Sequence, residues 1–148
     1  MDPDPVRVAN AAAWLRKASQ DLFRVDRCMT AESPDLEDAL FHCQQAAEKA
    51  LKAFLSWHDV PFRKTHDLAV LGTQCGGIDG TLNQFVARLD DLTEYAWVYR
   101  YPISLQDPLP ADAIEAARVA RDIVSEIRQR LPCEVRDAAG GDLKSSHH

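Results

Sequence analysis

The sequence predicts an all-α protein, an up-and-down antiparallel bundle of four long helices and one short helix. Apolar residues recur at alternating spacings of four and three along most of the 148 residues, which is the pattern of helices with one buried face. No stretch of the sequence shows the strict alternation and β-branched enrichment of a strand. Prolines and glycines separate the helical stretches by short links, and short links favour antiparallel neighbours.

Two long helices are expected in the first half of the chain. The first begins after Pro5 and fades at Thr30. The second begins at Ser33-Pro34-Asp35, where a serine oxygen can cap the helix and proline lacks only an N–H that would have no partner there. Its apolar stripe continues to about Trp57 or His58.

Three further helices are expected, the first of them short. The short helix is expected to begin at a Thr65 cap and to end at Gly76-Gly77. The next is expected to begin at a Thr81 cap and to end at Arg100-Tyr101-Pro102. The last is expected to lie between Pro110 and Pro132. Residues 8–131 would then form one helical domain, and residues 132–148 a flexible C-terminal tail.

Charge and motifs exclude several classes of function. The chain carries 17 Lys and Arg against 23 Asp and Glu, a net charge of −6, which argues against general attraction to nucleic acid. Neither GxGxxG nor GxxxxGK[ST] occurs, which excludes the two common phosphate-binding loops. The four cysteines form no CxxC pair, so free thiols and no metal or cofactor are expected. Without a signal-like or membrane-spanning run, a cytoplasmic location and no membrane contact are expected.

The second helix carries a more specific pattern. The stretch Phe41 to Leu55, FHCQQAAEKALKAFL, resembles the signature helix of the HEPN domain family, hxQQAaEKalKAlL. Three other segments resemble the same family in the same order: Trp14, Ala18 and Asp21-Leu22 in its first helix, Thr65-His66-Asp67-Leu68 at its tHdL helix start, and Arg100-Tyr101-Pro102 at the RYP that ends its fourth helix. The resemblance covers about Val8 to Leu131.

This resemblance implies a small helical bundle, often a homodimer, usually encoded beside a minimal nucleotidyltransferase in prokaryotic toxin–antitoxin or stress loci and associated with nucleotide or RNA binding. Some members of the family are metal-independent ribonucleases with an Arg-x(4–6)-His motif. The present sequence departs from that motif. Leu105, Gln106 and Asp107 stand where the histidine should follow Arg100, and no arginine precedes another histidine of the helical part at that spacing.

Several residues are candidates for binding a phosphate or a base. They are Lys49, Lys52, Arg63, Lys64, His66, Arg100 and Tyr101. Each also has a structural interpretation. Glu48 and Lys52 are spaced for a solvated ion pair on the helix surface, and His66, at the first helical position after a Thr65 cap, can either attract an anion or contact a neighbouring helix. Arg100 at a helix C-terminus complements the helix dipole without any ligand.

Three hypotheses about function remain open. The leading one is a non-enzymatic binding module, a homodimer that binds a nucleotidyltransferase-type partner and a nucleotide through Lys49, Lys52, His66 and Arg100. The second is an RNA endonuclease in which His66 and Arg100 meet in space as a rearranged catalytic site. The third is a purely structural interaction protein that covers a toxin.

Overall fold

The computed structural model describes residues 3–62, 64–65, 67–98 and 107–140, and only the backbone of residues 95–98. Within these residues the chain is helical and has no strand, which confirms the predicted all-α class. The elements are α1 (Pro5–Thr30), α2 (Leu36–Trp57), α3 (Leu68–Ile78), the 3₁₀ helix η1 (Gly80–Phe85), α4 (Val86–Val98), α5 (Pro110–Arg130) and α6 (Cys133–Ala138). None of these helices is long and apolar enough to cross a membrane.

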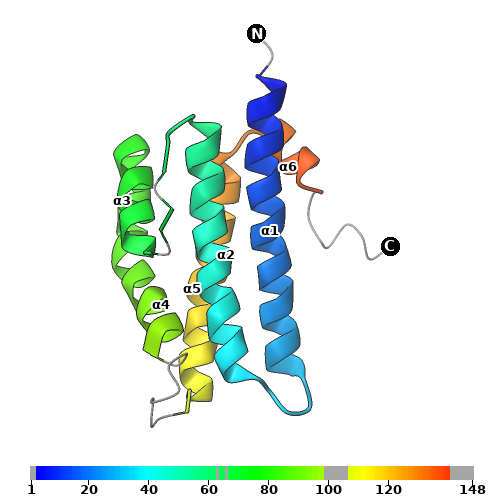
Figure 1. The fold of residues 1–148 in the computed structure, drawn as a ribbon, viewed down its shortest axis with the longest axis vertical. Coiled ribbons are helices and arrows are strands. Elements are labelled where there is room, and N and C mark those ends of the chain that lie inside the picture. Colours follow the sequence, from blue (N-terminus) through cyan, green and yellow to red (C-terminus); the bar gives the residue numbers. More distant parts are fainter. Residues whose placement is uncertain (1–2, 63, 66, 99–106, 141–148) are drawn as a thin grey trace.

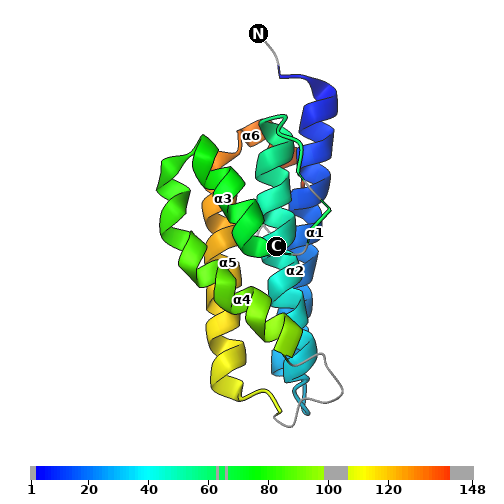
Figure 2. The same ribbon diagram turned by 60° about the vertical axis from the view of Figure 1, so that its left-hand side comes forward.

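Helix α2 is the centre of the bundle. It packs against α1, α3, α4 and α5, while α6 packs against α1. Figure 1 shows α1 and α2 side by side and antiparallel, with α3 and α4 on the other side of α2 and α5 behind it. The view in Figure 2 shows α4 and α5 running in opposite directions, so the long helices alternate up and down as predicted.

Small side chains let the neighbours approach α2 closely. Ala46, Ala47, Ala50 and Ala53 are completely buried, and larger apolar residues such as Phe54 fill the space between the helices. Interiors of this kind are packed as densely as organic crystals, so each position has little freedom to change volume. The core therefore fixes α2 firmly, and the side chains that α2 carries are fixed with it.

The predicted bounds of α1 and α5 are confirmed, but the three predicted hydroxyl caps are wrong. The N-caps Asp35 and Asp67 lie two residues after the predicted Ser33 and Thr65. The third N-cap, Asp79, lies two residues before the predicted Thr81. Each aspartate accepts a backbone N–H bond of 3.0 Å. A carboxylate makes a stronger, charge-assisted bond than a hydroxyl and also complements the positive end of the helix dipole.

Three other elements differ from the expectation. Helix α3 continues through Gly76-Gly77 to Ile78, and the helix expected from Thr81 begins with the separate turn η1. Residues 133–138, in the segment expected to be a flexible tail, form α6, and its Val135 is buried against the bundle. A six-residue helix with one buried residue gives too little periodicity to be recognised in the sequence.

Candidate functional site

A buried carboxylate joins α1 to the polar side of α2. Asp21 has only 1% of its surface exposed. Its two oxygens contact Lys49 Nζ at 2.5 Å and His42 Nδ1 at 2.9 Å, and Arg24 Nη1 lies 3.5 Å from the same oxygen as His42. A buried carboxylate is tolerated only when it is paired and hydrogen-bonded in this way. We call Asp21, Arg24, His42 and Lys49 the Asp21 cluster.

The Asp21 cluster orients the imidazole of His42. A carboxylate oxygen can only accept a hydrogen bond, so Nδ1 of His42 carries a proton and donates the hydrogen bond that Asp21 accepts. The other ring nitrogen, Nε2, is directed toward the exposed Asp38, whose oxygen lies 3.8 Å away. The ring is thus held in one orientation, with 16% of its side chain exposed.

Lys52 is buried rather than solvated, which corrects the prediction of a surface ion pair with Glu48. The two charged groups lie 3.1 Å apart with side-chain exposures of 10% and 4%. The ammonium of Lys52 also lies over the rings of Trp14, at 5.3 Å, and Phe62, at 5.6 Å. Cation–π contacts of this kind strengthen when water is excluded. The pair is covered because α1 and the segment after α2 fold over it.

The segment between α2 and α3 is held at two points. Phe62 packs edge-on against Trp14 of α1, with ring centroids 6.0 Å apart. The side-chain nitrogen of Gln74 in α3 donates a hydrogen bond of 3.2 Å to the carbonyl of Pro61. Lys64 lies on this segment and is exposed. This exposed cation follows the two anchored residues closely in the chain and is available to a ligand.

The N-terminus of α3 already has a carboxylate. Helix α3 begins at Leu68 and its N-cap is Asp67, so the predicted cap at Thr65 is wrong. The Asp67 carboxylate accepts from Ala69 N at 3.0 Å, where the predicted phosphate would have bound. The positive end of this helix dipole is therefore neutralised from within the chain.

The structure separates the predicted ligand residues. Lys49 and Lys52 each contact a buried carboxylate, and Lys64 lies on the surface. The other four, Arg63, His66, Arg100 and Tyr101, lie outside the described residues. A meeting of His66 with Arg100 therefore stays a prediction.

The sequence interpretation missed Asp21, Arg24 and His42 as a group. Asp21 follows Ala18 by three positions and precedes Val25 by four, so a charged residue stands on the apolar stripe of α1. Such an interruption is a signal for a buried ion pair. Its partners on α2 lie 21 and 28 residues away, and only the packing of the two helices reveals them.

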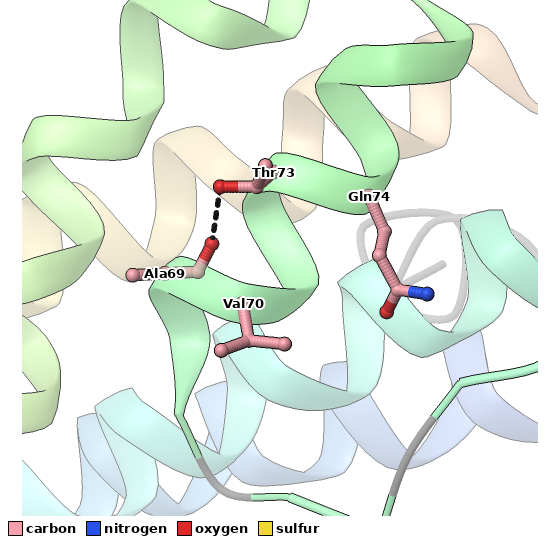
Figure 3. Close-up of a pocket in the computed structure, with 4 residues that line it drawn as sticks. All are labelled: Ala69, Val70, Thr73 and Gln74. Atoms are coloured by element: carbon pink, nitrogen blue, oxygen red, sulfur yellow. Dashed lines mark hydrogen bonds between the residues drawn. The ribbon is translucent and has the colours of Figure 1, made fainter.

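A shallow hollow lies beside α3. It has a volume of about 480 Å³ and is lined by Ala69, Val70, Thr73 and Gln74 (Figure 3). Volumes in this range are common among small-molecule sites. The hollow adjoins the anchored segment because Gln74 contacts Pro61 directly.

Comparison with protein-family models matches residues 11–130, from α1 to the end of α5, to the HEPN domain. Searches of the curated proteins and of the solved structures return no match. The family match extends over well more than half of the chain and includes the whole of the α2 pattern and the Asp21 cluster. The chain therefore belongs to the HEPN domain family.

Proposed function

We propose that this chain is a non-enzymatic HEPN binding module that acts in the cytoplasm as a homodimer, beside a nucleotidyltransferase-type protein of a toxin–antitoxin or stress-response system, and that it binds a nucleotide. Membership of the HEPN family supports the proposed nucleotidyltransferase-type partner. The observation that carries the binding role is the exposed Lys64 on the segment between α2 and α3, because Lys49 and Lys52 are paired inside the fold. These cations stabilise the fold, and a protein of net charge −6 that uses them in this way is suited to a small ligand rather than a nucleic-acid backbone.

The ligand half of this proposal assigns the phosphate contact to Lys64 and Arg100. Titration calorimetry with ATP, GTP and a short RNA tests it. We expect binding of a nucleotide, and a several-fold loss of affinity in Lys64→Ala and Arg100→Ala, because each would remove one cation from a phosphate. Arg118→Ala is the matched control, since this arginine is 64% exposed on α5 and, among the described residues, pairs only with Glu115 on the same helix. Absence of heat at near-millimolar ligand contradicts the nucleotide role.

The partner half is tested independently. We expect a nucleotidyltransferase gene beside the gene for this chain, and co-purification of the two proteins when they are expressed together. Sedimentation of the purified chain at several concentrations tests the homodimer. A stable complex without any nucleotide binding would instead support a purely structural interaction protein.

RNA cleavage is a second candidate, and one observation favours it. In the Asp21 cluster a histidine is oriented through Nδ1, and an arginine approaches the same carboxylate. An imidazole for proton transfer and a guanidinium for phosphorane charge are the groups that metal-independent cleavage needs. These are His42 and Arg24, in place of the predicted His66 and Arg100.

The cleavage candidate has a direct test. Total RNA is incubated with micromolar protein, with His42→Ala and with His58→Ala as the control on the surface. Cleavage that His42→Ala abolishes and His58→Ala preserves would support it. Intact RNA in all three samples rejects it, and cleavage lost only in a His66→Ala variant would restore the original pair.

A further inference from the structure

The outer side of α1 carries a row of exposed cations. Lys17, Arg24 and Arg27 follow one another at spacings of seven and three positions, which places them on one side of the helix. Arg24 keeps 55% of its side chain exposed although it approaches Asp21. Figure 1 shows α1 at the edge of the bundle, on the opposite side of α2 from α3 and α4. We call Lys17, Phe23, Arg24 and Arg27 the α1 face, which extends about 15 Å at a rise of about 1.5 Å per residue.

The carboxylates of α1 do not neutralise this face. Helix α1 has two of them, and Asp21 is buried toward α2. The other, Asp26, bonds to Arg121 of α5 at 2.5 Å. Among the residues that the structure describes, Lys17 and Arg27 form no ion pair. The α1 face is therefore of one sign in a chain whose net charge is −6.

An exposed aromatic ring lies among these cations. Phe23 has 53% of its surface exposed. The guanidinium of Arg27, one turn later, lies over this ring at 5.9 Å from its centre, and such a cation–π contact favours one arrangement of the two side chains. Aromatic residues and arginine contribute most of the binding energy in protein interfaces. The α1 face thus combines an apolar anchor with positive charges on both sides of it.

Charge selects among the possible occupants of the face. A second copy of this chain in a two-fold dimer would bring the face against itself, so that cations would meet cations. A long nucleic-acid strand would continue past the face onto the rest of the chain, which is more acidic than the total of −6 because that total includes these cations. A protein surface with carboxylates around an apolar pocket complements both the charges and the ring.

We propose that the α1 face is the docking surface of a protein partner, and that this partner presents carboxylates to Lys17, Arg24 and Arg27 around an apolar pocket for Phe23. The inference rests on the proposed partner protein and names the face that this partner contacts. It is separate from the nucleotide half of the proposed function, which involves Lys64 on the segment between α2 and α3.

Calorimetric titration of the full chain with the nucleotidyltransferase-type protein that is expected to be encoded beside it tests the inference. We expect Phe23→Ala and Arg27→Glu each to weaken the complex by about tenfold or more, because the first removes the apolar anchor and the second places a carboxylate against carboxylates. Ile114→Ala and Arg118→Glu on α5 are the matched controls. These side chains are 54% and 64% exposed, and their substitutions make the same kinds of change away from the α1 face.

A second measurement uses the wild-type chain and so does not depend on the folding of a variant. A carbodiimide joins an ammonium group to a carboxylate that it contacts. We therefore expect mass spectrometry of the treated complex to find Lys17 crosslinked to an aspartate or glutamate of the partner.

Four outcomes overturn the inference. If the complex forms, Lys17 is not crosslinked and all variants bind alike, the partner stands but docks elsewhere. If Arg27→Glu and Arg118→Glu weaken the complex equally, only the overall charge matters. If Arg27→Glu abolishes binding of a short oligouridine but leaves the protein complex unchanged, the α1 face binds nucleic acid. If no complex forms, the inference and the partner half of the proposed function fail together.

Discussion

Asp21 decides much of the chemistry at the scale of single residues. It forms an ion pair with Lys49, which is then not available to a ligand, and it holds the ring of His42 in one orientation. Spacing along the sequence suggested neither role, because the two partners lie 21 and 28 residues after Asp21 and belong to another helix. The sequence was sufficient to make Lys49 and Lys52 candidates for a phosphate contact, but whether a lysine meets a phosphate or a carboxylate depends on what packs opposite it.

Removal of the Asp21 carboxylate should destabilise the fold strongly. Asp21→Ala leaves the partly buried Lys49 ammonium without its partner, and we expect a loss of about 3 kcal/mol in the free energy of unfolding. Asp122→Ala breaks the pair with Arg88, whose side chains are 33% and 46% exposed, and should change stability by less than about 1 kcal/mol. Urea denaturation followed by circular dichroism measures both. Equal losses would show that the Asp21 cluster is no stronger than a surface pair.

At the scale of elements, the packing of α3 on α4 depends on a missing side chain. A Cβ added at Gly72 would lie 2.6 Å from Leu89 Cδ1, and Leu89 is almost completely buried. A Cβ added at Gly77, one and a half turns later in the same helix, would meet nothing within 4 Å. Gly72 therefore sets the distance between the two helices, whereas Gly77 does not.

These two glycines give a matched pair of substitutions. Gly77→Ala should stabilise the protein by about 0.5–1 kcal/mol, since alanine loses less backbone entropy in a helix. Gly72→Ala makes the same gain but overpacks the core, so it should be less stable than Gly77→Ala by about 1–3 kcal/mol. Thermal unfolding of the two variants checks the difference. Equal melting temperatures would mean that Leu89 moves aside freely.

Prolines explain which helix limits could be predicted. The start of α1 and both limits of α5 follow from Pro5, Pro110 and Pro132, whose rings restrict the backbone whatever packs around them. The caps at Asp67 and Asp79 could not be chosen over nearby threonines, because both residue types cap helices and tertiary packing sets where the chain turns.

On the scale of the whole molecule, the cysteine thiols differ in how deeply they are buried. Cys43 and Cys75 are completely buried in the core, and burial raises the pKa of each thiol to about 12. Cys133 is exposed, and a hydrogen bond to Glu134 raises its pKa. The thiolate is the reactive form, so access and pKa both protect the two core cysteines at neutral pH.

Thiol labelling should therefore report global unfolding. With a chromogenic disulfide reagent at pH 8 we expect early reaction at Cys133 and at the partly exposed Cys28, which Cys133→Ser and Cys28→Ser remove in turn, and reaction of Cys43 and Cys75 only as fast as the bundle opens. Added urea should accelerate this slow phase in step with the loss of helical signal. Rapid labelling of Cys43 or Cys75 in the native protein would contradict the enclosed core.

The central position of α2 has a consequence during synthesis. Its neighbours lie on both sides of it in the chain, with α1 before it and α3, α4 and α5 after it. A nascent chain that ends before Pro110 can pair α1 with α2 but leaves the surface that α5 will cover open to water. Domains emerge from the ribosome over several seconds at typical rates of about 5–20 residues per second. Over that interval the helix that is best protected in the finished molecule is the one most open to chaperones and to aggregation.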